Sequence, residues 1–565
     1  MKKTLFLQAF LALSLSCTTL LAQTETKIPN LDKIHAPLVV GVVPCDAYVG
    51  LAKMDNGEWR HYNYGENAAT QRPMYLSSTN QGKSWQTKYL PKDLPYADQK
   101  SPVSGEYIRI FTGNGKVYAM RTEGGLEGGR SIFLIDEKLG IMNKPPIFIR
   151  GGKRVISAAH RTDRSGAYVY YSDDDGRTWK ISQQVNAPKH VKSGFHQGIR
   201  WNHGAVEPTV VELQDGRLWM IMRTAQDTHY QSFSSDGGET WSEATPSPFY
   251  GTITMPTLYR MHDGRLLFFW CNTTPLPELP SATGVWDDVF TNRDAVHVAI
   301  SDNDGKTWKG FRELLLNGER NSSNFGNTVS GQDKSVHQVQ AVEVEPGKIL
   351  VAVGQHAQCR RLLLFDVDWL YEPTRFNDFS DGLNQWSAFR YYKGIVGHCS
   401  YNRQEEPILV EHPDKKGAKA IKLSYEPNDS LLQDNQGAVW NFPAAKNGFI
   451  KLSMKLPKDS EGIDLVLNDR WFNPTDTVAK YQCMYAIPIN RKQLRIQDET
   501  WHSVSIHWQH NQSATLYVDG RKRGKFRSIT TTLHGISYLH LLGGKKSDNT
   551  GIYIEYVEGG KELMK

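Results

Sequence analysis

Short runs of apolar residues, each followed by a polar residue and a turn, recur from about residue 38 to residue 370. Five runs share one layout, a turn, an apolar strand and a polar residue at its end: 115–122, 153–162, 216–224, 264–273 and 347–356. Helical periodicity is nearly absent, and apolar runs without alternation indicate strands that are buried on both faces. With the segment 38–85, these repeats predict an all-β protein whose first part is a six-bladed β-propeller.

One phrase, Ser-x-Asp/Asn-x-Gly-x-Ser/Thr-Trp, occurs four times, at residues 78–85, 172–179, 234–241 and 301–308. Its Asp or Asn can bond nearby backbone N–H groups and hold a tight turn. Its Gly supplies backbone freedom that a Cβ would forbid, and we expect its Trp to pack the turn onto the neighbouring blade. The phrase resembles the Asp box of the sialidase-like superfamily. That resemblance implies a sialidase-like propeller and glycans as the ligand class, with the boxes themselves serving the fold.

A second unit is expected after Pro373, where a new strand-rich region opens at residues 379–386. Within it, residues 500–502 and 514–520 resemble the laminin-G, concanavalin A-like family. The resemblance implies a β-sandwich jelly roll that either binds glycans or only packs. We therefore expect a signal peptide at 1–22, a catalytic propeller at 23–372 and a sandwich at 373–565.

The charge balance and the first residues of the chain indicate which partners to exclude and where the protein is located. The 66 basic and 60 acidic residues nearly balance, and without a basic tail or basic helix no nucleic-acid partner is expected. Residues 1–22 resemble a bacterial secretory signal, with Lys2 and Lys3 before an apolar stretch. This predicts a secreted or periplasmic protein, and lipid attachment at Cys17 is an alternative that its flanking residues fit less well. No later segment is long and apolar enough to span a membrane.

The cysteines after residue 22 are scattered and form no disulfide scaffold: Cys45, Cys271, Cys359, Cys399 and Cys483. No Cys-x-x-Cys or His-x-x-x-His pairing indicates a metal site. We expect no metal, no other cofactor and a monomer.

Polar residues at the strand ends are candidates for a shared site, because equivalent positions of successive blades face the same end of the propeller axis. They are Arg121, His160 and Arg161, Arg223, Asn272, and Gln355 and His356. Several guanidinium groups that face one cavity would form a fork-like anion site. The alternative is that each Arg only pairs with an acidic neighbour.

The stretch from Glu207 to Arg223 resembles the third-blade region of sialidases. In that family the leading Glu assists the nucleophile and the Arg binds the substrate carboxylate, so the resemblance implies these roles here. Arg293, eight residues before Ser301, matches a second carboxylate-binding Arg, although Arg164 has the same spacing before Ser172. A buried structural Glu–Arg pair is the alternative for Glu207 and Arg223.

The chain also departs from the sialidase pattern. The first strand, residues 36–44, has no Arg, and the early catalytic Asp has no clear counterpart. At the place of the nucleophilic Tyr stands His337 or Gln338, and a His can act as general acid or base near neutral pH. This argues against ordinary sialidase chemistry and favours His337 acting opposite Glu207.

Two further segments are candidates for the rim of the funnel. An insertion at about 273–292 carries Asp287 and Asp288, either of which is a candidate acid, and long loops on a rigid scaffold often carry function. His196 and His203 lie just before Glu207, and His203 is a candidate for substrate binding.

Together these features predict a secreted glycoside hydrolase that is exo-acting, because a closed funnel accepts a chain end. Its partner would be an acidic oligosaccharide or polysaccharide that carries a uronic acid, a sulfated sugar or a sialic-type sugar. Two alternatives stay open: a polysaccharide lyase that acts on uronates, and a propeller that binds glycans without turnover.

Overall fold

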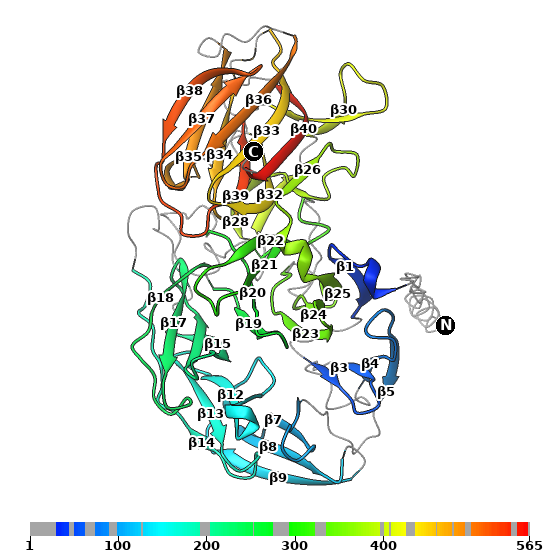
Figure 1. Ribbon diagram of the computed structural model, residues 1–565, viewed down its shortest axis with the longest axis vertical. Helices are drawn as coiled ribbons and strands as arrows, with labels where there is room; N and C mark the ends of the chain where they lie inside the picture. Colours follow the sequence, from blue (N-terminus) through cyan, green and yellow to red (C-terminus); the bar gives the residue numbers. More distant parts are fainter. Residues whose placement is uncertain are drawn as a thin grey trace, which may run out of the picture.

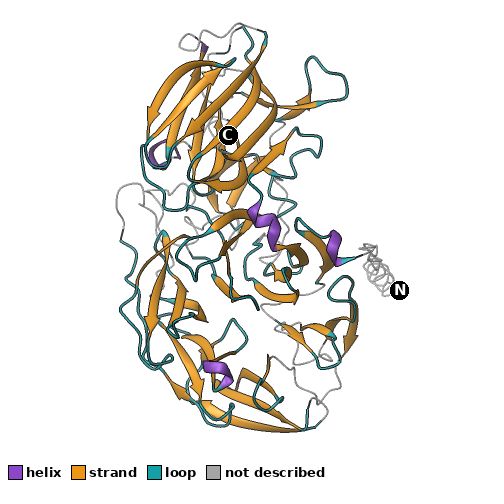
Figure 2. Cartoon of the chain, viewed as in Figure 1, coloured by secondary structure: helices purple, strands orange, loops and turns teal. Residues whose placement is uncertain are grey.

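The computed structural model describes residues 30–43, 50–62, 74–89, 99–125, 128–191, 200, 204–251, 253–274, 293–321, 335–395, 401–405, 408–424, 436–458, 460, 462–476, 479–491, 499–543 and 551–562. The expected signal peptide at 1–22, with Cys17, and also Cys45 and Cys399 lie outside these residues. Strands dominate the described chain, and helices are few (Figure 2). The helical segments are η1 (Leu31–Lys33), η2 (Arg150–Gly152), η3 (Val367–Tyr371) and α2 (Ala479–Gln482).

Six antiparallel sheets follow one another in the described residues up to Asp366 (Figure 1). The first sheet contains β2 (Leu51–Lys53), β3 (Trp59–Tyr62), β4 (Met74–Ser78) and β5 (Gln86–Tyr89). The second contains β6 (Gln99–Lys100), β7 (Tyr107–Gly113), β8 (Lys116–Glu123) and β9 (Gly129–Asp136). The third contains β10 (Gly140–Ile141), β11 (Ile147–Ile149), β12 (Arg154–Arg161), β13 (Ala167–Ser172) and β14 (Lys180–Ile181).

The next two sheets repeat the four-stranded pattern. The fourth contains β15 (Val206–Glu212), β16 (Leu218–Arg223), β17 (Thr228–Ser234) and β18 (Thr245–Tyr250). The fifth contains β19 (Thr257–Arg260), β20 (Leu266–Trp270), β21 (Ala295–Ser301) and β22 (Lys309–Leu316). Strands β12, β16, β20 and β21 are buried along almost their whole length, as runs without alternation predict.

The sixth sheet joins the two ends of this region. Strands β23 (Gln340–Glu345), β24 (Lys348–Val353) and β25 (Arg361–Asp366) are completed by β1 (Leu38–Val42), which pairs with β25. Val40 then shares a buried core with Leu350 and Leu362. The side chain of Gln340 fastens the first sheet to the sixth, because its Oε1 accepts hydrogen bonds from the backbone N–H groups of Gly50 and Leu51 at 2.6 and 2.7 Å.

The four repeated phrases form the turns that the sequence predicts. In the second copy, Asp174 accepts hydrogen bonds from the backbone and hydroxyl of Thr178 at 2.8 and 2.7 Å. Gly176 has a φ of 84°, in the region that favours glycine. The Trp of the fourth copy, Trp308, lies 6.3 Å from the ring of Trp219 in the preceding sheet. The turns therefore lock each sheet and pack it against its neighbour, and the structural role expected of them is confirmed.

The rest of the chain forms two larger sheets around one apolar core. One contains β30 (Leu409–Glu411), β31 (Lys419–Leu423), β40 (Ile552–Lys561), β33 (Gly448–Lys455), β36 (Trp501–Trp508), β37 (Ser513–Val518) and β38 (Arg521–Arg527), with β26 (Thr374–Asn377) beside β40. The other contains β27 (Trp386–Ser387), β32 (Gly437–Ala445), β39 (Ile536–Leu542), β34 (Gly462–Asn468) and β35 (Tyr485–Asn490). Strands β28 (Phe389–Ile395) and β29 (Tyr401–Glu405) form a separate pair.

A buried polar contact joins this part to the fifth sheet (Figure 1). The hydroxyl of Tyr538, on β39, donates a hydrogen bond to Glu313 of β22 at 2.8 Å and also contacts the ring of His297 on β21. Asn441 of β32 donates to the carbonyl of Phe311 at 3.0 Å. Among the residues that the structure describes, no helix is long and apolar enough to cross a membrane.

Candidate functional site

A cavity of about 550 Å³ is lined mainly by residues of the second, third and fourth sheets, with Leu51 of the first sheet and Gln340 of the sixth. Its wall includes Glu207 and Val206 of β15, Arg223 at the end of β16, and His160 near the end of β12. Residues 139–145, which include β10 and the loop that follows it, supply a further part of the wall. The expected convergence of strand-end residues is therefore seen for His160 and Arg223.

A local irregularity aims Glu207 at Arg223. Val206 lies opposite Arg223 in the ladder, and the register shifts between Val206 and Thr209. Glu207 sits within this shift at a φ of 47°, a conformation that non-glycine residues seldom adopt. Bulges of this kind re-aim side chains, and such backbone strain concentrates at functional sites.

Glu207 and Arg223 form a buried ion pair. Nη1 of Arg223 donates a hydrogen bond to Oε2 of Glu207 at 2.8 Å, and their side chains are 7% (Arg223) and 12% (Glu207) exposed. Burial by itself raises the pKa of Glu207, but the charge and hydrogen bond of Arg223, with help from His160 and His337, hold it well below its usual range. Glu207 is therefore a carboxylate at neutral pH.

His160 is a neutral partner of this pair. Its Nδ1 accepts a hydrogen bond from the backbone N–H of Glu207 at 3.2 Å, which puts the proton of the neutral ring on Nε2. Burial lowers the pKa of His160 to about 4, although the nearby Glu207 carboxylate opposes that shift. At neutral pH the ring thus offers one N–H donor and adds no charge.

Sequence reasoning missed Lys144, which lines the cavity from the loop between β10 and β11. Its Nζ is buried and has no hydrogen-bond partner among the described residues. Burial lowers the pKa of Lys144 to about 7, against the opposing effect of Glu207. No repeat or motif marks this Lys, and only its neighbours in the fold reveal it.

Two more cations line the cavity, Arg109 of β7 and Arg164 after β12. In the sequence, the one feature that marks Arg164 is its position eight residues before Ser172, the spacing that Arg293 has before Ser301. Together with Arg223 they place three guanidinium groups beside one carboxylate in this wall. The balance favours an anionic ligand.

Two of the predicted arginines lie elsewhere. Arg121 is paired with Asp175 at 2.6 Å, in the turn at 172–179. Arg161 is paired with Asp136 at 2.5 Å and lies over the ring of Tyr168. Neither lines the cavity, so the shared funnel does not extend to them, and each instead satisfies its charge with an acidic neighbour. Arg161 follows His160 directly, and successive strand residues point to opposite faces.

Arg293, His337 and Gln338 are buried, and none of them is among the residues that line the cavity. The carbonyl of Arg293 accepts a hydrogen bond from the N–H of Val336 at 2.8 Å, and the Arg293 guanidinium donates to the carbonyl of Ile253. Gln338 has a φ of 66°, and its Oε1 has no hydrogen-bond partner among the described residues. His337 is 1% exposed, and it contributes to the lowered pKa of Glu207.

The remaining candidates cannot be placed. Asp287, Asp288, His196 and His203 lie outside the described residues. The described residues contain no group of three or more His, Cys, Asp or Glu that could hold a metal ion. Free thiols occur at Cys271, Cys359 and Cys483, all of them buried.

One family model matches part of this region. Residues 134–338 match the family model described as a BNR repeat-like domain. This segment includes three of the four repeated phrases, together with Glu207 and Arg223. The region is therefore sialidase-like, as the repeated phrases predict.

Several solved structures are similar at low identity. A Dyadobacter fermentans protein of unknown function is 14% identical, with a TM-score of 0.40, over 59% of this chain and 99% of its own. Trypanosoma rangeli sialidase in complex with sialic acid is 13% identical, with a TM-score of 0.34, over 94% of this chain and 95% of its own. A Hadza microbial sialidase is 14% identical, with a TM-score of 0.39, over 58% of this chain and 66% of its own. The sialidase-like assignment itself rests on the family model and the repeated phrases.

Proposed function

We propose that this protein is a secreted glycoside hydrolase that acts on an acidic glycan from a chain end. The observation that carries the proposal is the ionised Glu207, held by Arg223 in a cavity with further cationic groups. In this proposal the six sheets are the blades of a catalytic propeller at 23–372. Residues 373–565 are a concanavalin A-like sandwich that follows it and can bind glycan.

The protonation state of Glu207 suggests which residue acts as the base and which as the acid. A carboxylate with a strongly lowered pKa is poorly suited to donate a proton at neutral pH, so Glu207 acts as the base that activates water or supports a nucleophile. Arg223 fixes its orientation and supplies positive charge for an acidic substituent. We assign the general acid to His337 or to Asp287 of the fifth-blade insertion, since glycoside hydrolysis requires an acid opposite the base.

His160, which also lines the cavity, stabilises the position of Glu207. By accepting the N–H of Glu207 it satisfies the backbone at the strained position. Its Nε2–H remains available as a neutral donor, because the pKa of about 4 leaves the ring uncharged at pH 7. The base is therefore positioned by contacts to both its backbone and its side chain.

The test compares the parent protein with Glu207→Gln and with the matched control Glu212→Gln. Glu212 lies on the same strand but outside the cavity. The panel contains sialosides, glucuronate-bearing and pectic polymers, and sulfated polysaccharides, with products read by mass and ultraviolet absorbance. Saturated sugar released by the parent and by Glu212→Gln, but not by Glu207→Gln, supports the hydrolase. Turnover that Glu207→Gln retains would reject the assigned role.

Two other functions predict different results in the same assay. A lyase would release an unsaturated uronate, which absorbs in the ultraviolet, and the guanidinium groups beside Glu207 suit neutralisation of a uronate carboxylate. A binding propeller would retain acidic glycans without product. That alternative is supported by the His and Gln at the place of the family's nucleophilic Tyr, positions 337 and 338.

A further inference from the structure

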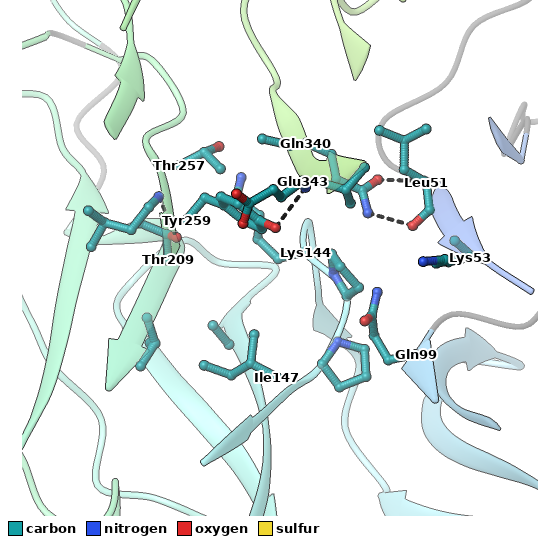
Figure 3. A pocket seen from close by; sticks show the side chains of 18 of the residues that line it. Leu51, Lys53, Gln99, Lys144, Ile147, Thr209, Thr257, Tyr259, Gln340 and Glu343 are labelled. Carbon is teal, nitrogen blue, oxygen red and sulfur yellow. Dashed lines mark hydrogen bonds between the residues drawn. The ribbon is translucent and has the colours of Figure 1, made fainter. Parts of the chain in front are cut away.

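The cavity beside Glu207 adjoins a second cavity of about 310 Å³, whose lining side chains are drawn in Figure 3. This second cavity is lined by the first strands of several sheets, which contribute residues such as Thr209, Thr257 and Gln340. The two cavities share four lining residues: Leu51, Lys144, Pro145 and Gln340. Lys144 is the one cationic side chain common to both walls, so it lies at their junction.

The amine of Lys144 is buried without a hydrogen bond from the described residues. A buried charge without a partner is costly, and folded proteins normally pair such groups. It follows Asn143, whose Oδ1 is also buried without a hydrogen-bond partner among the described residues, and it precedes Pro145 and Pro146, which offer no side-chain acceptor. The described residues therefore give the amine no acceptor.

Several polar groups that line the same walls are already engaged. Gln340 uses its amide on the backbone of the first sheet, accepting two N–H groups and donating to the carbonyl of Leu51 at 2.9 Å. The hydroxyl of Tyr259 accepts the N–H of Glu343 at 2.8 Å (Figure 3). Glu207, the carboxylate that acts on Lys144, is bonded to Arg223.

The charges around Lys144 also favour a negative ligand. The cavity beside Glu207 is also lined by Glu207 of β15, His160 of β12, Arg223 of β16, Arg109 of β7 and Arg164 after β12. The second cavity is also lined by Lys53 of β2, His262 after β19 and Glu343 of β23. Glu343 is bound by the backbone N–H of His262 at 2.7 Å and of Gly347 at 2.9 Å. Cations thus outnumber carboxylates in the combined walls.

We propose that Lys144 is the anion-recognition residue at the junction of the two cavities, where its Nζ donates to a carboxylate or sulfate of an acidic sugar. This inference rests on the proposed function for the class of ligand, and it adds a specific donor that selects acidic over neutral sugars. The bound anion would provide the acceptor that Lys144 lacks. It would also draw a proton from solvent onto the amine, since a nearby negative charge favours the protonated form.

Binding measurements test the inference without relying on turnover. Titration calorimetry at pH 8 would compare the parent with Lys144→Met, Lys144→Arg and the control Lys138→Met, which changes an exposed Lys in the turn after β9. The probes are D-glucuronate, N-acetylneuraminate, D-glucose 6-sulfate and D-glucose. We expect Lys144→Met to weaken binding of at least one acidic probe by about ten- to a hundredfold, the effect of one charged hydrogen bond. Glucose binding should not change, and Lys144→Arg should recover part of the loss.

Two further readouts strengthen the test. In buffers with different ionisation enthalpies, the parent and Lys138→Met should take up a proton when they bind the acidic probe, and Lys144→Met should not. If Lys144→Met fails to fold, acetic anhydride labelling of the parent replaces it, with the acidic probe expected to protect Lys144 specifically. The carboxylate and sulfate arms show which anion the site accepts.

The inference fails if the parent binds every acidic probe no more tightly than glucose, or if Lys144→Met and the parent bind them equally. Unchanged labelling of Lys144 in the presence of the probes would count against it in the same way. Absence of glycan cleavage together with Lys144-dependent binding would reject the hydrolase and leave the anion site standing. The two proposals can therefore fail separately.

Discussion

Replacing Arg223 with Met removes the guanidinium that pairs with Glu207 and keeps a side chain of similar reach. Two unit charges about 4 Å apart attract by about 4 kcal/mol at an effective dielectric constant of 20. Removing one member of a buried pair costs roughly 3–5 kcal/mol, because the other charge stays buried. Since the Glu207 side chain is 12% exposed, we expect the lower end, a loss of about 3 kcal/mol in the free energy of unfolding at pH 7.

A double-variant cycle separates the pair from other effects of the substitution. Glu207→Gln removes the carboxylate charge but keeps an amide oxygen that can accept from Arg223. Combined with Arg223→Met it leaves no buried charge, so the double variant should be more stable than Arg223→Met alone by about 1–2 kcal/mol. Urea unfolding followed by tryptophan fluorescence gives the three differences from the shifts in midpoint.

The same variant has a defined pH dependence. In the parent, the pKa of Glu207 lies below its ordinary value of 4.5, so the pair stabilises the fold above pH 4.5 and loses that contribution as the pH falls further. In Arg223→Met, burial raises the pKa of Glu207, so the variant loses stability as the pH rises above 4.5. The difference between parent and variant should therefore be larger at pH 7 than at pH 4. Additive effects in the cycle, or an equal loss at both pH values, would refute the reasoning.

Three other substitutions probe parts of the fold away from the pair. Asp236→Ala removes a carboxylate that accepts two backbone N–H groups and a hydroxyl in its turn, so thermal unfolding should show a loss of about 1–3 kcal/mol with the activity per folded molecule unchanged. Arg121→Met breaks the ion pair with Asp175 outside the cavity and should lower the unfolding temperature without weakening glycan binding. Weakened glycan binding would instead show that Arg121 belongs to the binding site. Tyr538→Phe deletes the hydroxyl that donates to Glu313 at the joint and should lower stability by about 1–3 kcal/mol, and hydrogen exchange at β22 and β39 should rise together if the contact couples the two parts.

Much of the fold follows from local sequence signals. Each repeated phrase contains its own acceptor, its own glycine and its own Trp, so its turn forms wherever the phrase occurs. The pairing of Glu207 with Arg223 can also be predicted from the sequence, because both residues lie on adjacent antiparallel strands in a recognisable stretch. These features depend on residues that are near each other in the chain.

The parts that sequence reasoning missed depend on contacts between distant segments. Lys144 gains its low pKa and its place between the cavities from a wall assembled by several sheets. Arg121 and Arg161 look equivalent to Arg223 at a strand end, but each forms an ion pair with a carboxylate in another strand or turn. Local patterns place a residue on a strand, and they do not say which charge will be opposite it.

The pairing of β1 with β25 determines how late in synthesis β1 can find its partner strand. Leu38 is among the first residues of the folded part to be made, yet its partner Leu364 follows only after the intervening sheets. At about 5–20 residues per second, this delay lasts tens of seconds, during which β1 has no partner strand. An unpaired strand edge can join another chain, so nascent copies on one messenger could exchange their first strands. The pairing of β1 with β25 that completes the sixth sheet therefore makes the biogenesis of the protein sensitive to translation rate and to crowding of nascent chains.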